Sequence, residues 1–169
     1  MKKVFVLIIV LSLVFGMSLM AGNKEFKKGN SFITGEFGFS SWATPFGVSY
    51  EMGLNENIGI GASAWLMSWS GIGISQTLIT PSVFAQYHFT EIKVAKLDVA
   101  AGATLGYSIY SADSDYIKLT GSSSLFLSAL ITVRYYFSDK IAVSLKETYS
   151  FVGAWSGSYA MIGVTYKLK

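Results

Sequence analysis

The sequence has no cysteine, only two prolines in 169 residues, and only 14% charged residues. Without cysteine, disulfide scaffolds, thiolate metal sites and thiol nucleophiles are excluded. The shortage of charge excludes a disordered chain, because such chains combine high net charge with few apolar residues. The apolar fraction is instead 51%, more than a soluble domain usually needs. A single domain that resides in a membrane is therefore the first expectation.

The amino-terminal segment has the order of an export signal. Two lysines precede an apolar stretch over 4–15 that only Ser12 interrupts, and small residues follow. This order predicts a secretory signal peptide over 1–21, cleaved after Ala21 or alternatively after Ser18. The competing interpretation is an uncleaved single-pass anchor, because the run over 4–20 approaches the length that crosses a bilayer.

Basic residues are too few and too scattered for a nucleic-acid partner. Removal of the signal peptide leaves 11 Lys and Arg against 10 Asp and Glu, a net charge of about +1. Arg134 is the only arginine. A nucleic-acid surface would need clustered basic residues with stacking aromatics, so this class of partner is excluded.

From residue 30 onward, apolar and small residues alternate with a period of two, which is typical of strands with two different faces. We count eight such runs, most of them near the length of a tilted transmembrane strand. They lie at 30–40, 46–54, 57–67, 77–89, 96–109, 123–137, 140–151 and 157–168. The sequence therefore predicts an all-β chain, with a short periplasmic segment over 22–29 ahead of the strands.

The residues on the two faces distinguish a membrane barrel from a soluble sandwich. A soluble sandwich exposes charged residues on its second face, whereas here that face is mostly Gly, Ser, Thr and Ala. Small residues fit inside a narrow barrel whose bulky aliphatic side chains face lipid. Because lipid cannot satisfy unpaired backbone groups, the strands must close on themselves. We predict an eight-stranded antiparallel up-and-down transmembrane β-barrel over 30–169.

The connections and the aromatic residues assign the two ends of this barrel. Connections after the second, fourth and sixth runs are tight, as at a periplasmic rim, whereas those after the third and fifth are longer. Aromatic girdles are expected at both membrane boundaries. The outer one would contain Trp42, Trp65, Trp69 and Trp155, and the inner one Tyr87, Phe89, Tyr135, Tyr136, Phe137 and Tyr166.

Two residues fit the alternation poorly. Pro81 interrupts the fourth run and indicates a bulge, because proline cannot donate a ladder hydrogen bond. Glu147 falls on the apolar face of the seventh run, where a carboxylate at the bilayer midplane would be costly. Either a bulge or a position near the outer interface would accommodate Glu147.

The carboxyl-terminal residues carry a resemblance to a known family. Gly163, Tyr166 and Leu168 are spaced as a glycine followed by hydrophobic residues three and five positions later. With the eight runs and the signal peptide, this pattern resembles the small bacterial outer-membrane barrels represented by the OmpA transmembrane domain, OmpX and OmpW. The resemblance implies a monomer among outer-membrane lipids, inserted with the help of periplasmic chaperones and the barrel-assembly machinery.

Five ionisable residues are expected to face the lumen: Glu36, Glu51, Asp98, Arg134 and Lys146. Charges inside a narrow barrel are costly unless they are paired. Depth counted along the strands pairs Arg134 with Asp98 or Glu51, and Lys146 with Glu36. Because eight strands leave an interior just wide enough for side chains, a structural polar plug is favoured over a gate or an ion relay.

Other motifs give weaker signals. His88, the only histidine, is predicted on the lumen side near the inner rim, too far along its strand from Ser82 and Thr80 to activate them. A lone histidine also cannot make the common metal sites. The barrels of this architecture that modify lipid A have their histidine and serine at the outer rim, and the outer loops here contain no histidine. We therefore predict no catalytic, cofactor or metal site.

Two further motifs have plain explanations. The sequence over 59–64 satisfies a dinucleotide-binding pattern, but another strand follows it instead of the helix that would hold a pyrophosphate. Asp113 and Asp115 in the loop over 110–124 have oxygens that suit a cation, but two acids two positions apart are a weak signal and a solvated loop is favoured.

Three functions remain open. The first is a non-enzymatic structural or surface-interaction protein with a plugged lumen. The second, which the resemblance to OmpW implies, is a carrier of small hydrophobic molecules, with Trp65 and Phe126 lining a pocket in the outer half of the lumen. The third, a lipid-modifying enzyme, is disfavoured by the placement of the only histidine.

Overall fold

The computed structural model describes residues 25–39, 43–71, 74–92, 94–114, 118–119, 123–153 and 158–169. The signal peptide predicted over 1–21 therefore lies outside the described residues. The strands are β1 (Ser31–Phe39), β2 (Phe46–Gly53), β3 (Ile58–Gly71), β4 (Ile74–His88), β5 (Leu97–Ser114), β6 (Lys118–Leu119), β7 (Ser123–Tyr136), β8 (Ile141–Val152) and β9 (Ser158–Lys167). In these ranges no helix is long and apolar enough to cross a membrane.

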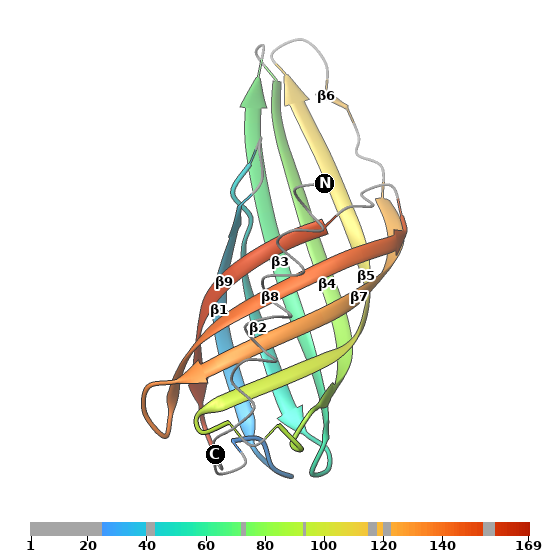
Figure 1. The fold of residues 1–169 in the computed structure, drawn as a ribbon. Coiled ribbons are helices and arrows are strands. Elements are labelled where there is room, and N and C mark those ends of the chain that lie inside the picture. Colours follow the sequence, from blue (N-terminus) through green and yellow to red (C-terminus); the bar gives the residue numbers. More distant parts are fainter. Residues whose placement is uncertain are drawn as a thin grey trace, which may run out of the picture.

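All strand pairs are antiparallel, and the sheet closes into a barrel (Figure 1). Neighbouring strands follow the order β4-β3-β2-β1-β9-β8-β7-β5, and the pairing of β4 with β5 completes the circle. The short strand β6 pairs with the far end of β5. The predicted eight-stranded antiparallel barrel is confirmed, and its eight runs correspond to β1–β5 and β7–β9.

The short connections over 54–57, 89–96 and 137–140 lie at the same end of the barrel as the carboxyl terminus. We call this the inner end and the opposite one the outer end. In Figure 1, β3, β4 and β5 extend beyond the other strands at the outer end. Tight inner connections agree with the sequence-based prediction.

The side chains alternate between an apolar exterior and a polar interior. On β2, every second residue is buried, so that Val48 and Tyr50 are exposed while Ser49 and Glu51 are enclosed. The exposed set is aliphatic and aromatic, and it includes Ile33, Val83, Leu105, Leu125, Ile131, Leu145 and Val164. The buried set includes Thr34, Gln86, Thr104, Ser128, Thr132, Ser144 and Thr165. This distribution is the reverse of that in a water-soluble protein.

Two outer connections are shorter than the sequence predicts. β3 continues to Gly71 and β4 begins at Ile74, so that only residues 72–73 separate them. β5 likewise continues to Ser114, where β6 pairs with its end. Serine, threonine and glycine in these segments indicate loops by composition, but backbone pairing with the neighbouring strand extends the sheet through them.

The predicted outer girdle of tryptophans is wrong for the two that the structure describes. Trp65 and Trp69 share the inward face of β3 with the buried Met67, while Trp42 and Trp155 lie outside the described residues. Distance along a strand places a residue near a rim of the barrel but does not specify the face on which its side chain lies.

The inner girdle also needs one correction, because Tyr136 is buried in the lumen. Its neighbours Tyr135 and Phe137 are exposed, with their rings in edge contact at 5.9 Å. On the same rim, Tyr87 and Phe89 are exposed and in edge contact at 5.3 Å. The period of two places Tyr136 on the opposite face from its neighbours.

Pro81 interrupts the pairing of β4 with β5 without distorting the pairing of β4 with β3. It pairs with Ala64 of β3, but no register pair joins Thr80 or Pro81 to the described residues of β5. Pairing resumes in the same register at Ser82. The missing N–H group of proline explains the gap, which takes the place of the predicted bulge.

Glu147 keeps the outward position that the alternation predicts. It is half-buried and lies in register between Ile131 and Ala160. The register of β8 shifts between Ser150 and Val152, on the outer side of Glu147. This irregularity leaves the direction of the Glu147 side chain unchanged.

Candidate functional site: the lumen of the barrel

A cluster of charged side chains lies in the inner half of the lumen. Arg134 on β7 forms ion pairs with Glu51 on β2 and, at 3.0 Å, with Asp98 on β5. His88 on β4 lies between the same two carboxylates, with Nδ1 2.7 Å from Asp98 and Nε2 2.8 Å from Glu51. Four strands thus bring together four buried side chains around one point of the barrel.

The hydrogen bonds of His88 specify its charge. Each ring nitrogen faces a carboxylate oxygen, and a carboxylate that also accepts from Arg134 is ionised. Both nitrogens must then carry protons, which makes His88 a cation. The cluster consequently holds two negative and two positive charges and is neutral, as a buried cluster requires.

Amide and hydroxyl groups complete the cluster on its outer side. Gln86 donates from Nε2 to Glu51 at 2.6 Å, and Thr132 donates from its hydroxyl to the amide oxygen of Gln86 at 3.1 Å. Both side chains are buried. Such connected networks fix the rotamers of their members more firmly than single bonds do.

The segment that precedes β1 packs against the charged cluster. The ring of Phe26 stacks on the imidazole of His88, and Phe26 is only 1% exposed. A backbone hydrogen bond from Gly29 N–H to the Gly53 carbonyl (2.9 Å) and a side-chain bond from Lys167 Nζ to the carbonyl of Glu25 (3.0 Å) hold the segment in place. The described part of the segment predicted to lie in the periplasm, residues 25–29, therefore places one buried ring against the lumen side chains.

A second ion pair lies further out. Lys146 on β8 contacts Glu36 on β1, and Ser49 donates to the same carboxylate at 3.1 Å. The ammonium group lies 5.5 Å from the ring centre of Trp65 and 5.7 Å from that of Phe84. A cation at these distances interacts favourably with aromatic faces.

Glycines make room for these side chains. A Cβ at Gly59 would collide with the carboxylate of Glu51 and lie 2.9 Å from His88 Nε2. At Gly61 it would collide with the ring of Phe84. The dinucleotide-like pattern at this point of β3 is thus explained by lumen packing.

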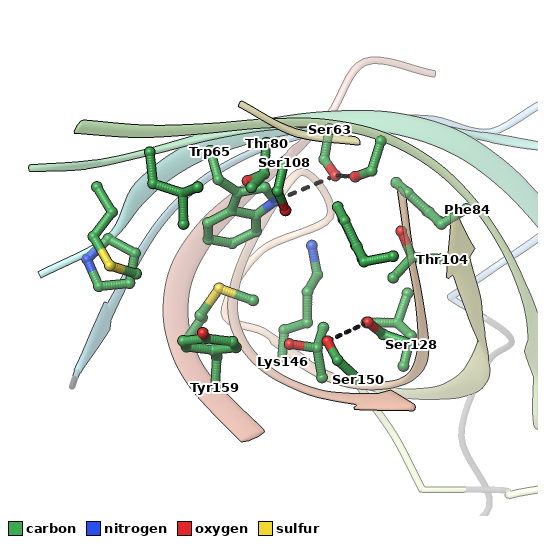
Figure 2. Close-up of a pocket in the computed structure, with 18 residues that line it drawn as sticks. Ser63, Trp65, Thr80, Phe84, Thr104, Ser108, Ser128, Lys146, Ser150 and Tyr159 are labelled. Atoms are coloured by element: carbon green, nitrogen blue, oxygen red, sulfur yellow. Dashed lines mark hydrogen bonds between the residues drawn. The ribbon is translucent and has the colours of Figure 1, made fainter. Parts of the chain in front are cut away.

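A cavity of about 100 Å³ occupies the outer half of the lumen, above Lys146 (Figure 2). Its walls are largely apolar and include Trp65, Met67, Leu78, Phe84, Phe126, Leu130 and Met161. Hydroxyl groups between them bond to each other, as in Ser63–Ser82 at 2.7 Å and Ser128–Ser150 at 2.6 Å. Trp65 and Phe126, the residues expected to line a pocket, both line this cavity.

The geometry limits the chemistry of this lumen. Both nitrogens of His88 are engaged by carboxylates, so that this ring has no lone pair with which to activate a hydroxyl. Ser82 and Thr80 line the cavity instead of approaching His88. The described residues form a charged cluster in the inner half of the lumen and a small, mostly apolar cavity beyond it.

All five predicted lumen residues face the lumen. Arg134 pairs with Asp98 and Glu51, and Lys146 pairs with Glu36, as their depth along the strands predicts. His88 and Phe26 are additions to that network. His88 is missed because histidine is counted as neutral when charges are paired. Phe26 is missed because the segment before the first strand has no alternation that would indicate an inward-facing ring.

The remaining predicted residues are less informative. Gly163 is buried, while Tyr166 and Leu168 are exposed at the inner end. Asp113 belongs to β5, where its backbone pairs with Lys118, and Asp115 lies outside the described residues. The role of Gly163, Tyr166 and Leu168 in insertion remains a prediction.

Comparison with solved structures identifies the fold. The amino-terminal barrel domain of OprF from Pseudomonas aeruginosa is similar with a TM-score of 0.65, at 14% identity over 83% of this chain and 98% of that one. The attachment invasion locus protein Ail of Yersinia pestis gives 0.60, at 14% identity over 83% and 99%. The outer-membrane protein OprG of P. aeruginosa gives 0.61, at 10% identity over 86% and 99%. The chain thus has the fold of small eight-stranded outer-membrane barrels.

Sequence comparison adds no nearer relative, since no family model and no curated protein matches the chain.

Proposed function

We propose that the chain is an integral protein of the bacterial outer membrane, exported by a cleaved signal peptide over 1–21. The continuous apolar exterior supports this location, because such a surface would aggregate in water. The fold shared with outer-membrane proteins supports it as well. Fractionation of the envelope, with heat-modifiable migration on a gel, tests it.

Within that membrane, the protein binds a small molecule in the outer half of its lumen and acts as a carrier. The single observation that carries this proposal is the cavity above Lys146, with its largely apolar walls. The unpaired stretch between β4 and β5 at Thr80 and Pro81 supports a sideways route, because Thr80 and its neighbour across the gap, Ser108, both line the cavity. A ligand could then exchange with the lipid phase without passing the closed inner half.

Xenon provides a direct test of the chamber, because it enters small apolar cavities. We expect xenon to shift the indole resonance of Trp65 in nuclear magnetic resonance spectra of the refolded barrel. Leucine at Ser108 should fill the chamber and abolish that shift. A response of Trp65 that persists unchanged in Ser108→Leu would contradict the assignment.

The second candidate is a structural or surface-interaction role without catalysis. The filled inner half favours it, since the charged cluster and Phe26 leave that part of the described lumen occupied by side chains. Planar-bilayer recordings separate a plugged barrel from a pore: steady open conductance would contradict the plug in both candidates.

A further inference from the structure

The cavity has one charged lining residue among those described, and its charge is already balanced. Lys146 is the lining cation, and its ammonium group is paired with the buried Glu36. The deeper cluster of Glu51, Asp98, Arg134 and the cationic His88 is neutral by itself. A ligand with a net charge would therefore bring an unpaired charge against largely apolar walls, which is unfavourable.

Lys146 nevertheless has hydrogen-bonding capacity toward the cavity. An ammonium group has three N–H donors, and those of Lys146 reach Glu36 and, at 3.4 Å, Ser49. Figure 2 shows the side chain pointing toward the middle of the cavity, beside Trp65. One donor at the floor of an apolar chamber suits one acceptor atom of a ligand.

The walls set the size and shape of the remainder of the ligand. Trp65, Met67 and Leu78 present apolar surface, and the hydroxyls of Ser63 and Ser82 share a hydrogen bond. The volume of about 100 Å³ is smaller than the roughly 150 Å³ of an engineered cavity that holds benzene. A compact, branched aliphatic body fits these limits better than an extended chain.

We propose that this cavity selects small uncharged molecules that combine a compact apolar body with one carbonyl or hydroxyl acceptor, which Lys146 binds. This inference rests on the proposed carrier function and specifies its ligand class. The selectivity arises from charge balance: Glu36 neutralises Lys146, so neither anions nor cations gain from entering.

Three probes of nearly equal shape test the selectivity: isobutyramide, isobutyrate and isobutylammonium. Each is titrated into the refolded barrel in lipid nanodiscs, and the indole resonance of Trp65, identified with Trp65→Phe, reports binding. Trp69→Phe is the matched control, because Trp69 faces inward on the same strand but does not line the cavity. Isobutyramide should bind at least about tenfold more tightly than either charged probe.

Two variants separate charge balance from shape. Glu36→Gln removes the balancing carboxylate and keeps a polar partner for Lys146, so the preference should turn toward isobutyrate. The pair Glu36→Gln with Lys146→Met keeps the site uncharged and removes the donor, so isobutyramide should bind more weakly while both charged probes remain excluded.

The outcomes distinguish the two levels of the proposal. Equal or tighter binding of isobutyrate or isobutylammonium to the unmodified protein overturns the ligand class and leaves the carrier function standing. If none of the three probes, nor xenon, shifts the Trp65 resonance, the ligand class and the carrier function are both overturned. Should Glu36→Gln fail to refold, the ratio of affinities in the unmodified protein decides alone.

Discussion

The ring of Phe26 lies parallel to the imidazole of His88, with the ring centres 3.5 Å apart and the planes inclined by 7°. A cationic imidazole between two carboxylates is thereby covered by an aromatic face. Phe32 stacks behind Phe26 at 5.9 Å, and Arg134 lies 5.1 Å from the centre of the Phe32 ring. Phe26, Phe32 and the buried charged side chains thus form one packed unit.

Removing the ring of Phe26 should destabilise the barrel and open its inner end. Phe26→Ala deletes a buried side chain, which costs about 3 kcal/mol in protein cores. We expect a lower urea midpoint for the refolded protein and brief conductance steps in planar bilayers. Lys28→Ala, at an exposed position of the same segment, should change neither property.

Breaking the charged cluster should cost more than removing a surface charge. Arg134→Ala leaves Glu51 and Asp98 buried with only His88 as a cation, and loss of one partner of a buried pair typically costs about 3–5 kcal/mol. Urea titration of the refolded barrel measures the effect. Lys140→Ala in the exposed inner turn is the control, and equal midpoints for the two variants would refute the role of the pair.

Two glycines of the barrel should respond differently to the same substitution. Alanine at Gly59 would collide with Glu51 and approach His88, whereas a Cβ at Gly35 meets no atom within 4 Å. We expect Gly59→Ala to lower the free energy of unfolding by about 2 kcal/mol or more, and Gly35→Ala by less than about 1 kcal/mol. Similar losses at both sites would show that the lumen is less tightly packed there.

The unpaired stretch of β4 should close when its proline is replaced. Pro81→Val provides the missing N–H group and suits a lipid-facing strand position. We expect new protection from hydrogen exchange at residue 81 and at Tyr107, together with slower exchange of isobutyramide. Ala85→Val, also exposed on β4, should leave both unchanged. Faster exchange in Pro81→Val would contradict the sideways route.

The sequence predicts the barrel well because the period of two encodes both faces of each strand. Leu125 and Leu127 face outward and Ser128 inward, as the alternation of the sixth run implies. The ion pairs are also predictable from the sequence, because a charge in a narrow lumen must be neutralised by a partner at the same depth.

Other features depend on contacts that no local pattern reveals. The inward ring of Phe26 depends on the space above His88, which only the closed barrel creates. The strand extensions through Ser70 and Ser75 depend on backbone pairing across β3 and β4, which overrides their loop-like composition. The cavity arises where small inward side chains from several strands lie at the same depth. The pattern within a single run does not show this coincidence.

The central claim is that bulky residues at alternate positions contact acyl chains while their neighbours face a closed lumen. The chain has no cysteine, so a single introduced cysteine carries a spin label at one defined position. Leu105 on β5 is exposed, whereas Ser144 on β8 is buried and does not line the cavity. In lipid bilayers, a label at Leu105→Cys should collide with oxygen and not with a water-soluble nickel chelate, whereas a label at Ser144→Cys should be shielded from both. Ready access of the nickel chelate to the label at Leu105→Cys would contradict the account.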